Sequence, residues 1–280
     1  MGVIDFTLNL AGLLLWVSWR SLSIERLVKT VPASLTGTIK RAGPPRSRRW
    51  YFLAGLLGLL YLRALLYWQI GSAVVWVPDL RLGPINLFFR SDRFGLMLLY
   101  SALGFAVTLA LFYLWLLLLS LVNGRVADAD PVQTIVRLHL GVVGRWPWPI
   151  RLLLPLVGVS AAWLAAYPLL ARLEIIKAAL SATQRLEQAV LIGFGAYLTW
   201  KYLIGVVLLL SLLATYVYLG SSPLWAFVLM TGSNLLLPLR RLPLRIGKVD
   251  MAPIVALLFV FLAAELAERG LTALYSRLPW

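Results

Sequence analysis

Three charged residues lie within long apolar stretches of the sequence: Arg63, Glu265 and Glu268. A charge at the centre of a bilayer costs about 2.5–3.5 kcal/mol on insertion scales, so an intramembrane charge needs a partner, a polar path or a route to the interface. For Arg63 two arrangements stay open. It can snorkel outward or stack on Tyr67, or it can pair in the membrane with Glu265 or Glu268. Glu265 also precedes Arg269 by four residues, which favours an ion pair within one helix.

A second group of candidate residues is basic or aromatic and lies in proline-containing turns. An Arg or Lys beside anionic headgroups contributes on the order of 1 kcal/mol of membrane affinity. Tryptophan prefers the same interface. We therefore predict that these turns bind anionic lipid headgroups or a partner protein through Arg145, Trp146, Arg240, Arg241, Arg245 and Lys248.

Catalytic chemistry has little support in the sequence. The chain has no cysteine and a single histidine, His139, with no second ligand pattern beside it. Zincin, phosphate-loop, nucleophile-elbow and dinucleotide motifs are absent from the sequence. We expect His139 to be structural or interfacial. The prediction is a protein that is not an enzyme and uses no metal or cofactor.

The composition indicates a helical membrane protein. Of the 280 residues, 61% are hydrophobic and only 13% are charged, and the mean hydropathy is +0.87. Soluble domains contain about 25% charged residues. The net charge of +15 would also suit a nucleic-acid-binding protein. The basic residues, however, lie mostly between apolar segments, where membrane orientation requires them, so nucleic acid is not an expected partner.

Six transmembrane helices are predicted, at residues 4–19, 50–70, 94–122, 152–171, 201–219 and 251–271. The connectors after the first, third and fifth spans carry the excess of Lys and Arg. The positive-inside rule places these connectors in the cytoplasm and both termini outside it. We expect Lys201 to snorkel from the outer end of the fifth span. Asp250 and Pro253 are expected to be the N-cap and an early helical proline of the sixth.

The spans form a predicted internal repeat. In each copy, one span crosses from the outer to the inner side of the membrane. A short amphipathic interfacial helix and a basic turn follow, and a second span crosses back. Asp130-Pro131 parallels Ser222-Pro223, and Arg145-Trp146-Pro147 parallels Arg241-Leu242-Pro243. The prediction is one all-α membrane domain over residues 1–280, containing three parallel hairpins: a degenerate copy at 1–71, a second at 94–173 and a third at 201–272.

The third copy resembles the YggT family, also called YlmG. The residues that carry the resemblance are Leu236-Leu237-Pro238-Leu239-Arg240-Arg241-Leu242-Pro243 and Asp250-Met251-Ala252-Pro253. The match is good over about fifty residues and weaker before them. Family members typically have two hairpins, whereas this chain has a predicted third. The resemblance implies a multi-pass protein of the bacterial cytoplasmic (inner) membrane. Relatives are associated with osmotic tolerance, with division or nucleoid organisation, and in plastids with assembly of a cytochrome b complex.

Two functions remain open. The first is a non-enzymatic membrane scaffold or assembly protein that presents basic cytoplasmic turns to anionic lipid or to partner proteins. Its expected partners are membrane lipids and either another membrane protein or further copies of the chain. The alternative is a channel or transporter subunit for ion or osmotic homeostasis, with Arg63 and Glu265 or Glu268 along a polar path.

Overall fold

The computed structural model describes residues 2–29, 47–74, 77–83, 85–124, 130–176, 179, 181–217, 222–239, 245–246 and 249–277. Most of these residues are helical. The helices are α1 (Gly2–Lys29), α2 (Ser47–Val74), α3 (Phe94–Val122), α4 (Pro131–Leu140), the 3-10 helix η1 (Gly141–Arg145), α5 (Trp148–Arg172), α6 (Ala182–Leu198), α7 (Trp200–Tyr216), α8 (Pro223–Leu235) and α9 (Ala252–Ser276). Two short hairpins lie in the connectors: β1 (Asp79–Leu82) with β2 (Ile85–Phe88), and β3 (Arg245–Ile246) with β4 (Val249–Asp250).

Five helical stretches among the described residues are long and apolar enough to cross a membrane: Gly2–Leu22, Arg49–Gly71, Phe94–Val122, Trp148–Arg172 and Ala182–Ala214. The predicted class, a helical protein with several membrane-spanning helices, is thereby confirmed. The predicted number of six transmembrane helices is not confirmed. The fifth stretch runs through α6 and α7, and α9 is not among the five. Helix α9 carries Glu265, Glu268 and Arg269 in its second half.

The chain divides into two compact units, and each is described by itself. Unit 1 contains residues 1–80 and 88–110, and unit 2 contains residues 81–87 and 111–280. The division at Ala110 falls inside α3 and therefore inside the predicted second hairpin. The three-hairpin repeat stays a prediction.

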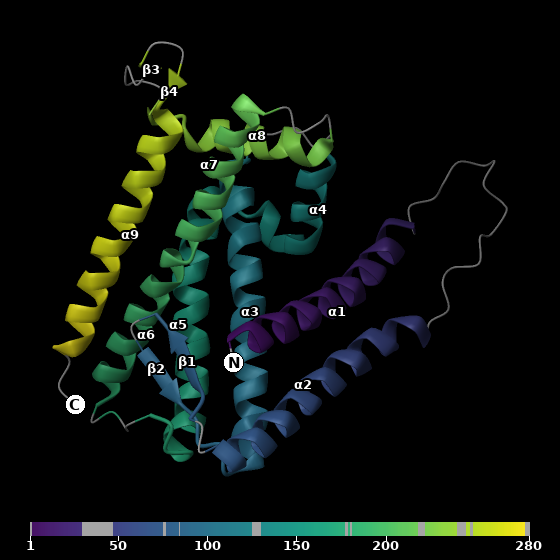
Figure 1. Cartoon of the computed structure of the whole chain (residues 1–280), viewed down its shortest axis with the longest axis vertical. Helices are drawn as coiled ribbons and strands as arrows, with labels where there is room; N and C mark the ends of the chain where they lie inside the picture. The colour runs from purple at the N-terminus through teal and green to yellow at the C-terminus, as the bar shows by residue number, and fades with distance from the viewer. Residues whose placement is uncertain are drawn as a thin grey trace. The chain divides into compact units, whose positions relative to one another are not determined.

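Unit 1 is built from α1, α2 and the first part of α3. Helices α1 and α2 run side by side (Figure 1). Gly12 on α1 allows a close approach, because a Cβ there would lie 3.0 Å from the ring of Phe105. The Ser101 hydroxyl donates to the Leu60 carbonyl at 2.9 Å and joins α3 to α2. The polar side chains described below lie between these three helices.

Unit 2 contains an antiparallel helix pair, α5 with α6, and a second layer in which α7 packs on α8 and α9. Gly193 permits a close approach of α5 and α6, since a Cβ there would lie 2.8 Å from the Leu156 carbonyl oxygen. Helices α6 and α7 are separated only by Thr199. The carbonyl of Thr199 accepts from the Trp115 indole at 3.3 Å, and the Trp200 indole donates to the Leu114 carbonyl at 3.1 Å. These two bonds tie the α6–α7 junction to α3.

Helices α4 and α9 begin near the prolines that the sequence indicated, but one predicted capping residue is wrong. Asp130 caps α4, because its carboxylate accepts from the Val132 and Gln133 amides at 2.8 and 3.0 Å. Pro253 lies in the first turn of α9, as expected, but the assignment of Asp250 as N-cap is wrong. Asp250 belongs to β4 and pairs with Arg245 of β3, so the strand ladder holds its backbone extended and Met251 becomes the cap.

Candidate functional site

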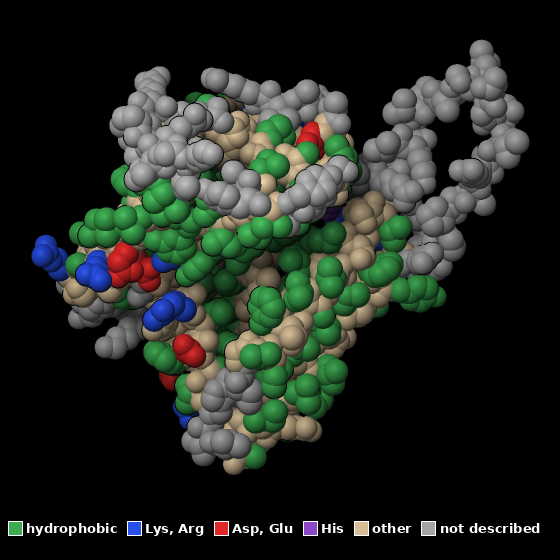
Figure 2. Space-filling model, turned by 45° about the horizontal axis from the view of Figure 1, so that its top comes forward, with side chains coloured by type: hydrophobic (Ala, Val, Ile, Leu, Met, Phe, Trp, Pro, Cys, Tyr) green, Lys and Arg blue, Asp and Glu red, His purple; other side chains and the backbone are tan. Residues whose placement is uncertain are grey.

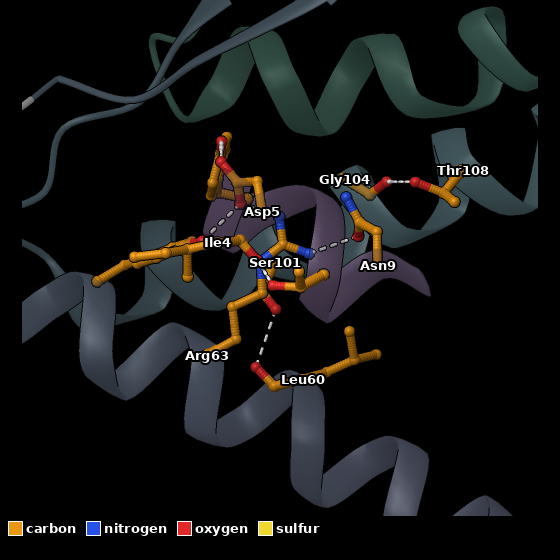
Figure 3. A network of polar contacts seen from close by, with 11 residues as sticks. Ile4, Asp5, Asn9, Leu60, Arg63, Ser101, Gly104 and Thr108 are labelled. Atoms are coloured by element: carbon orange, nitrogen blue, oxygen red, sulfur yellow. Dashed lines mark hydrogen bonds and ion pairs between the residues drawn. The ribbon is translucent and has the colours of Figure 1, made fainter. Parts of the chain in front are cut away.

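Arg63 is buried in unit 1, with only 2% of its side chain exposed, and it is paired. One terminal nitrogen, Nη2, lies 2.6 Å from Oδ1 of Asp5. The other, Nη1, donates to Oδ1 of Asn9 at 2.7 Å (Figure 3). Of the two open arrangements for Arg63, the structure therefore has the buried one. The suggested partners Glu265 and Glu268 are wrong, because Asp5 of α1 supplies the carboxylate.

Two tyrosines complete what we call the Arg63 network: Asp5, Asn9, Arg63, Tyr67 and Tyr100. The Tyr67 hydroxyl donates to Oδ1 of Asp5 at 2.5 Å, and the Tyr100 hydroxyl donates to Oδ2 at 3.2 Å. The guanidinium carbon lies 5.5 Å and 5.7 Å from the centroids of the same two rings. The carboxylate thus has three donors, and the cation has a carboxylate, an amide and two aromatic rings.

Each of the three helices places two residues of this site four positions apart, so that both lie on one face. Helix α1 supplies Asp5 and Asn9, and α2 supplies Arg63 and Tyr67. Helix α3 supplies Tyr100 and, one turn later, Gly104. A Cβ at position 104 would lie 3.1 Å from Nη2 of Arg63, so this glycine leaves room for the guanidinium.

The sequence interpretation missed three members of the network: Asp5, Asn9 and Tyr100. It gave Asp5 no role beyond its position at the start of the predicted first span, residues 4–19. A usable signal was present, because Asp5 and Asn9 form a polar i,i+4 pair in the mostly apolar first half of α1. That spacing repeats in Arg63 and Tyr67 on α2. Matching polar pairs on neighbouring membrane helices favour contact between them.

Four charged residues gather in unit 2 and form what we call the α9 charge cluster: Lys201, Glu265, Glu268 and Arg269. Nζ of Lys201 lies 2.9 Å from Oε2 of Glu268, and Nε of Arg269 lies 2.9 Å from Oε1 of Glu265. The expected Glu265–Arg269 pair is present. The expected snorkelling of Lys201 is wrong, because this mostly buried side chain is held by Glu268 of α9. Figure 2 shows side chains of both charges together at the edge over the C-terminal part of α9, beside hydrophobic surface.

A third candidate site lies where η1 turns the chain from α4 into α5. Val142, Arg145, Trp146 and Trp148 are all exposed there, and we call this group the basic corner. The neighbouring Arg151 turns inward instead, donating from Nη1 to the Ser120 hydroxyl at 2.6 Å. Of the other predicted turn residues, Arg240, Arg241 and Lys248 lie outside the described residues, and Arg245 is described only as part of β3.

The short helices α4 and α8 meet at a buried amide cluster that the sequence interpretation did not anticipate. The Asn123 amide donates to the Thr231 hydroxyl at 2.8 Å and accepts from Asn234 at 2.9 Å. The Gln133 amide donates to the backbone carbonyl of Asn123 at 3.3 Å. These bonds tie α4 and α8 to the end of α3. Since amides carry no charge, only the tertiary contacts distinguish them from ordinary loop residues.

His139 belongs to the buried face of α4. Its Nδ1 lies 3.0 Å from the Ile135 carbonyl oxygen, one turn earlier in the same helix. Its ring makes an edge contact with Phe112, with 6.3 Å between the ring centroids. The ring contact with Phe112 joins α4 to α3, whereas the Ile135 contact lies within α4.

No family model, curated protein or solved structure matches this chain. The resemblance of the third basic turn to the YggT family stays a prediction.

Proposed function

We propose that this protein is a non-enzymatic integral membrane scaffold or assembly protein of YggT type, whose basic turns bind anionic lipid headgroups or a partner at the cytoplasmic face of a bacterial inner membrane. The basic corner carries the proposal. It combines an exposed arginine with two exposed tryptophans and an exposed valine at the end of the candidate span Trp148–Arg172. This is the combination of side chains that the headgroup region accommodates.

Helix α4 supports the same proposal from the side chains on its two faces. One face packs against the rest of the protein and buries Gln133, Val136 and His139. Its other face exposes Ile135 and Leu138. A helix of 10 residues is too short to cross a bilayer, so an exposed apolar face on it suits the interface plane. The basic corner follows directly and would extend that contact.

Lipid retention tests the proposal. Purified protein is exchanged into mixed micelles that contain phosphatidylglycerol and phosphatidylcholine, and the retained lipid is quantified by native mass spectrometry. We expect the wild-type chain to retain phosphatidylglycerol preferentially. The change Arg145→Gln with Trp146→Ala should reduce that retention several-fold, and Arg240→Gln, Arg241→Gln and Arg245→Gln together should reduce it further.

Arg172→Gln provides the matched control, because Arg172 is an exposed arginine in the last turn of the same helix α5. This change should leave the retention of phosphatidylglycerol unaltered. Equal retention by all variants, together with unchanged recovery of co-purifying membrane proteins, would refute the lipid-binding and partner-binding role of the turns.

The alternative, a channel or transporter subunit, depended on a polar path through Arg63 and Glu265 or Glu268. Each of these residues has a partner of its own: Asp5 for Arg63, Arg269 for Glu265, and Lys201 for Glu268. Paired, neutralised charges support a scaffold more than a conduction path. Ion flux through liposomes that contain the purified protein, if abolished by Arg63→Leu with the fold retained, would favour the alternative.

A further inference from the structure

Arg151 is a partly buried cation that has no carboxylate partner among the residues that the structure describes. It lies in the first turn of α5, beside the basic corner. Its Nη1 donates to the Ser120 hydroxyl at 2.6 Å and to the Ser120 carbonyl at 3.2 Å. The ion pairs between described residues do not include it. Removing a charge from water is costly unless an opposite charge balances it, so an anion from outside the chain would complete this site.

The guanidinium of Arg151 also has donors without acceptors. Neither Nε nor Nη2 bonds to a residue in the described part of the chain, and Nε is buried. A buried donor without an acceptor costs stability. Beside Nη2 lies Gly124, where an added Cβ would come 3.9 Å from that nitrogen. Since position 124 carries no side chain, Nη2 keeps space on this side for an oxygen of a ligand.

The surroundings of Arg151 are those of the boundary between headgroups and hydrocarbon. The candidate span Trp148–Arg172 begins three residues before it, which is about 4.5 Å along the helix axis. Trp146 and Trp148 are exposed beside it, and tryptophan prefers this boundary. Arg145 is exposed in the preceding turn and adds a second positive charge. At this depth, the anionic group that a membrane offers is the phosphate of a phospholipid.

We propose that Arg151 binds the phosphate of an anionic phospholipid through Nη2 while Ser120 holds Nη1. This inference rests on the proposed function and names the residue that selects the lipid at the basic corner. The bonds to Ser120 order the side chain before the lipid arrives, which lowers the entropic cost of binding. Because Arg151 lacks a carboxylate partner, a lipid with net negative charge is preferred. A zwitterionic lipid would bring a cation of its own to the site.

The contact with Ser120 has a second consequence that the test must separate from lipid binding. Ser120 lies in the last turn of α3, where an arginine stabilises the free carbonyls and the negative end of the helix dipole. Any change of Arg151 should therefore lower stability, whether or not lipid is present. The informative quantity is the additional stability that lipid gives, because a ligand stabilises only a fold that binds it.

The experiment measures the rise in Tm of the full chain when phosphatidylglycerol is added to phosphatidylcholine micelles. The wild-type protein should show a clear rise, and inorganic phosphate alone should give none. Arg151→Lys keeps the charge, but a single nitrogen cannot reach Ser120 and the phosphate from opposite ends, so the rise should fall about threefold or more. Ser120→Ala keeps the whole guanidinium without its anchor and should lose about half of the rise.

Arg172→Gln is the matched control, because it removes an arginine from the other end of α5 and should keep the full rise. An unreduced rise in both Arg151→Lys and Ser120→Ala would overturn the Arg151 site. The lipid-binding role of the basic corner would then still stand if Arg145→Gln with Trp146→Ala abolished the rise. An equal rise with inorganic phosphate would overturn the assignment to a lipid. No rise in the wild-type protein would refute both the Arg151 site and lipid binding by the basic turns.

Discussion

The Arg63 network and the α9 charge cluster use the same ion-pair chemistry in two different surroundings. The Arg63–Asp5 distance is 2.6 Å and the Arg269–Glu265 distance is 2.9 Å. Arg63, however, is 2% exposed and lies among three helices, whereas Arg269 is 76% exposed on one. The first carboxylate receives bonds from an arginine and two tyrosines. The comparison shows that the surrounding donors and helices, more than the pair itself, decide whether a membrane charge is satisfied within one chain.

The Arg63 network also joins three helices, whereas the α9 charge cluster joins two. Only 6% of the α1 candidate span is fully buried, so burial of apolar side chains holds this helix in unit 1 less completely than it holds α2 or α3. Lipid tails are as apolar as leucine, and hydrophobic contact therefore contributes little to helix association inside a bilayer. Polar bonds from Asp5 and Asn9 to α2 and α3 are accordingly the specific attachment of α1.

The largest expected effect comes from breaking the buried pair. Arg63→Leu leaves the Asp5 carboxylate without its cation, which should lower the free energy of unfolding by about 3–5 kcal/mol. Thermal unfolding in a fixed detergent measures the loss. The double change Asp5→Leu with Arg63→Leu should recover most of it, because no buried charge remains. A double variant as unstable as the single one would show that the network does more than neutralise charge.

The tyrosine bonds should have an intermediate effect. Tyr67→Phe removes a 2.5 Å bond to the carboxylate and should cost about 1.5–3 kcal/mol of unfolding free energy. Tyr100→Phe removes a bond of 3.2 Å and should cost less. Tyr61→Phe, at an exposed position on α2, is the control and should leave unfolding unchanged. A larger loss from Tyr100→Phe than from Tyr67→Phe would contradict the ranking of the two bonds by length.

The smallest effect is expected at the exposed pair. Glu265→Gln, measured on detergent-solubilised monomer, should change the unfolding free energy by only about 0.3–0.5 kcal/mol, since exposed i,i+4 pairs contribute little. Added salt should reduce the difference further. A loss comparable to that of Arg63→Leu would erase the distinction between the two charged regions.

The sequence predicted the elements of the fold better than their contacts. The third span, at residues 94–122, coincides with α3, and the helix of residues 223–235 follows the predicted Ser222-Pro223 start. Apolar runs and prolines are local signals, so these boundaries are readable directly. Asp250 failed as an N-cap because its conformation is set by pairing with Arg245, a contact outside the helix.

The ion-pair partner of Arg63 shows how far the sequence could predict the candidate site. The sequence identified Arg63 as an unusual residue and left snorkelling and a buried partner open, but the partners it suggested were glutamates near the other end of the chain. The actual partner, Asp5, looked like a helix boundary. Glu265 was paired correctly with Arg269, because that contact lies within one helix and follows from spacing alone.

By itself, the sequence determined the helical class with several apolar spans, the proline-marked helix starts and the i,i+4 pair, since each depends on composition or on neighbours within a few residues. Only the tertiary structure decided which charges are buried, which helix supplies each partner, and which face of α9 stays uncovered. Those features depend on how helices far apart in the chain pack together. In a uniformly apolar sequence, hydrophobicity cannot distinguish the packed face of a helix from the face towards lipid.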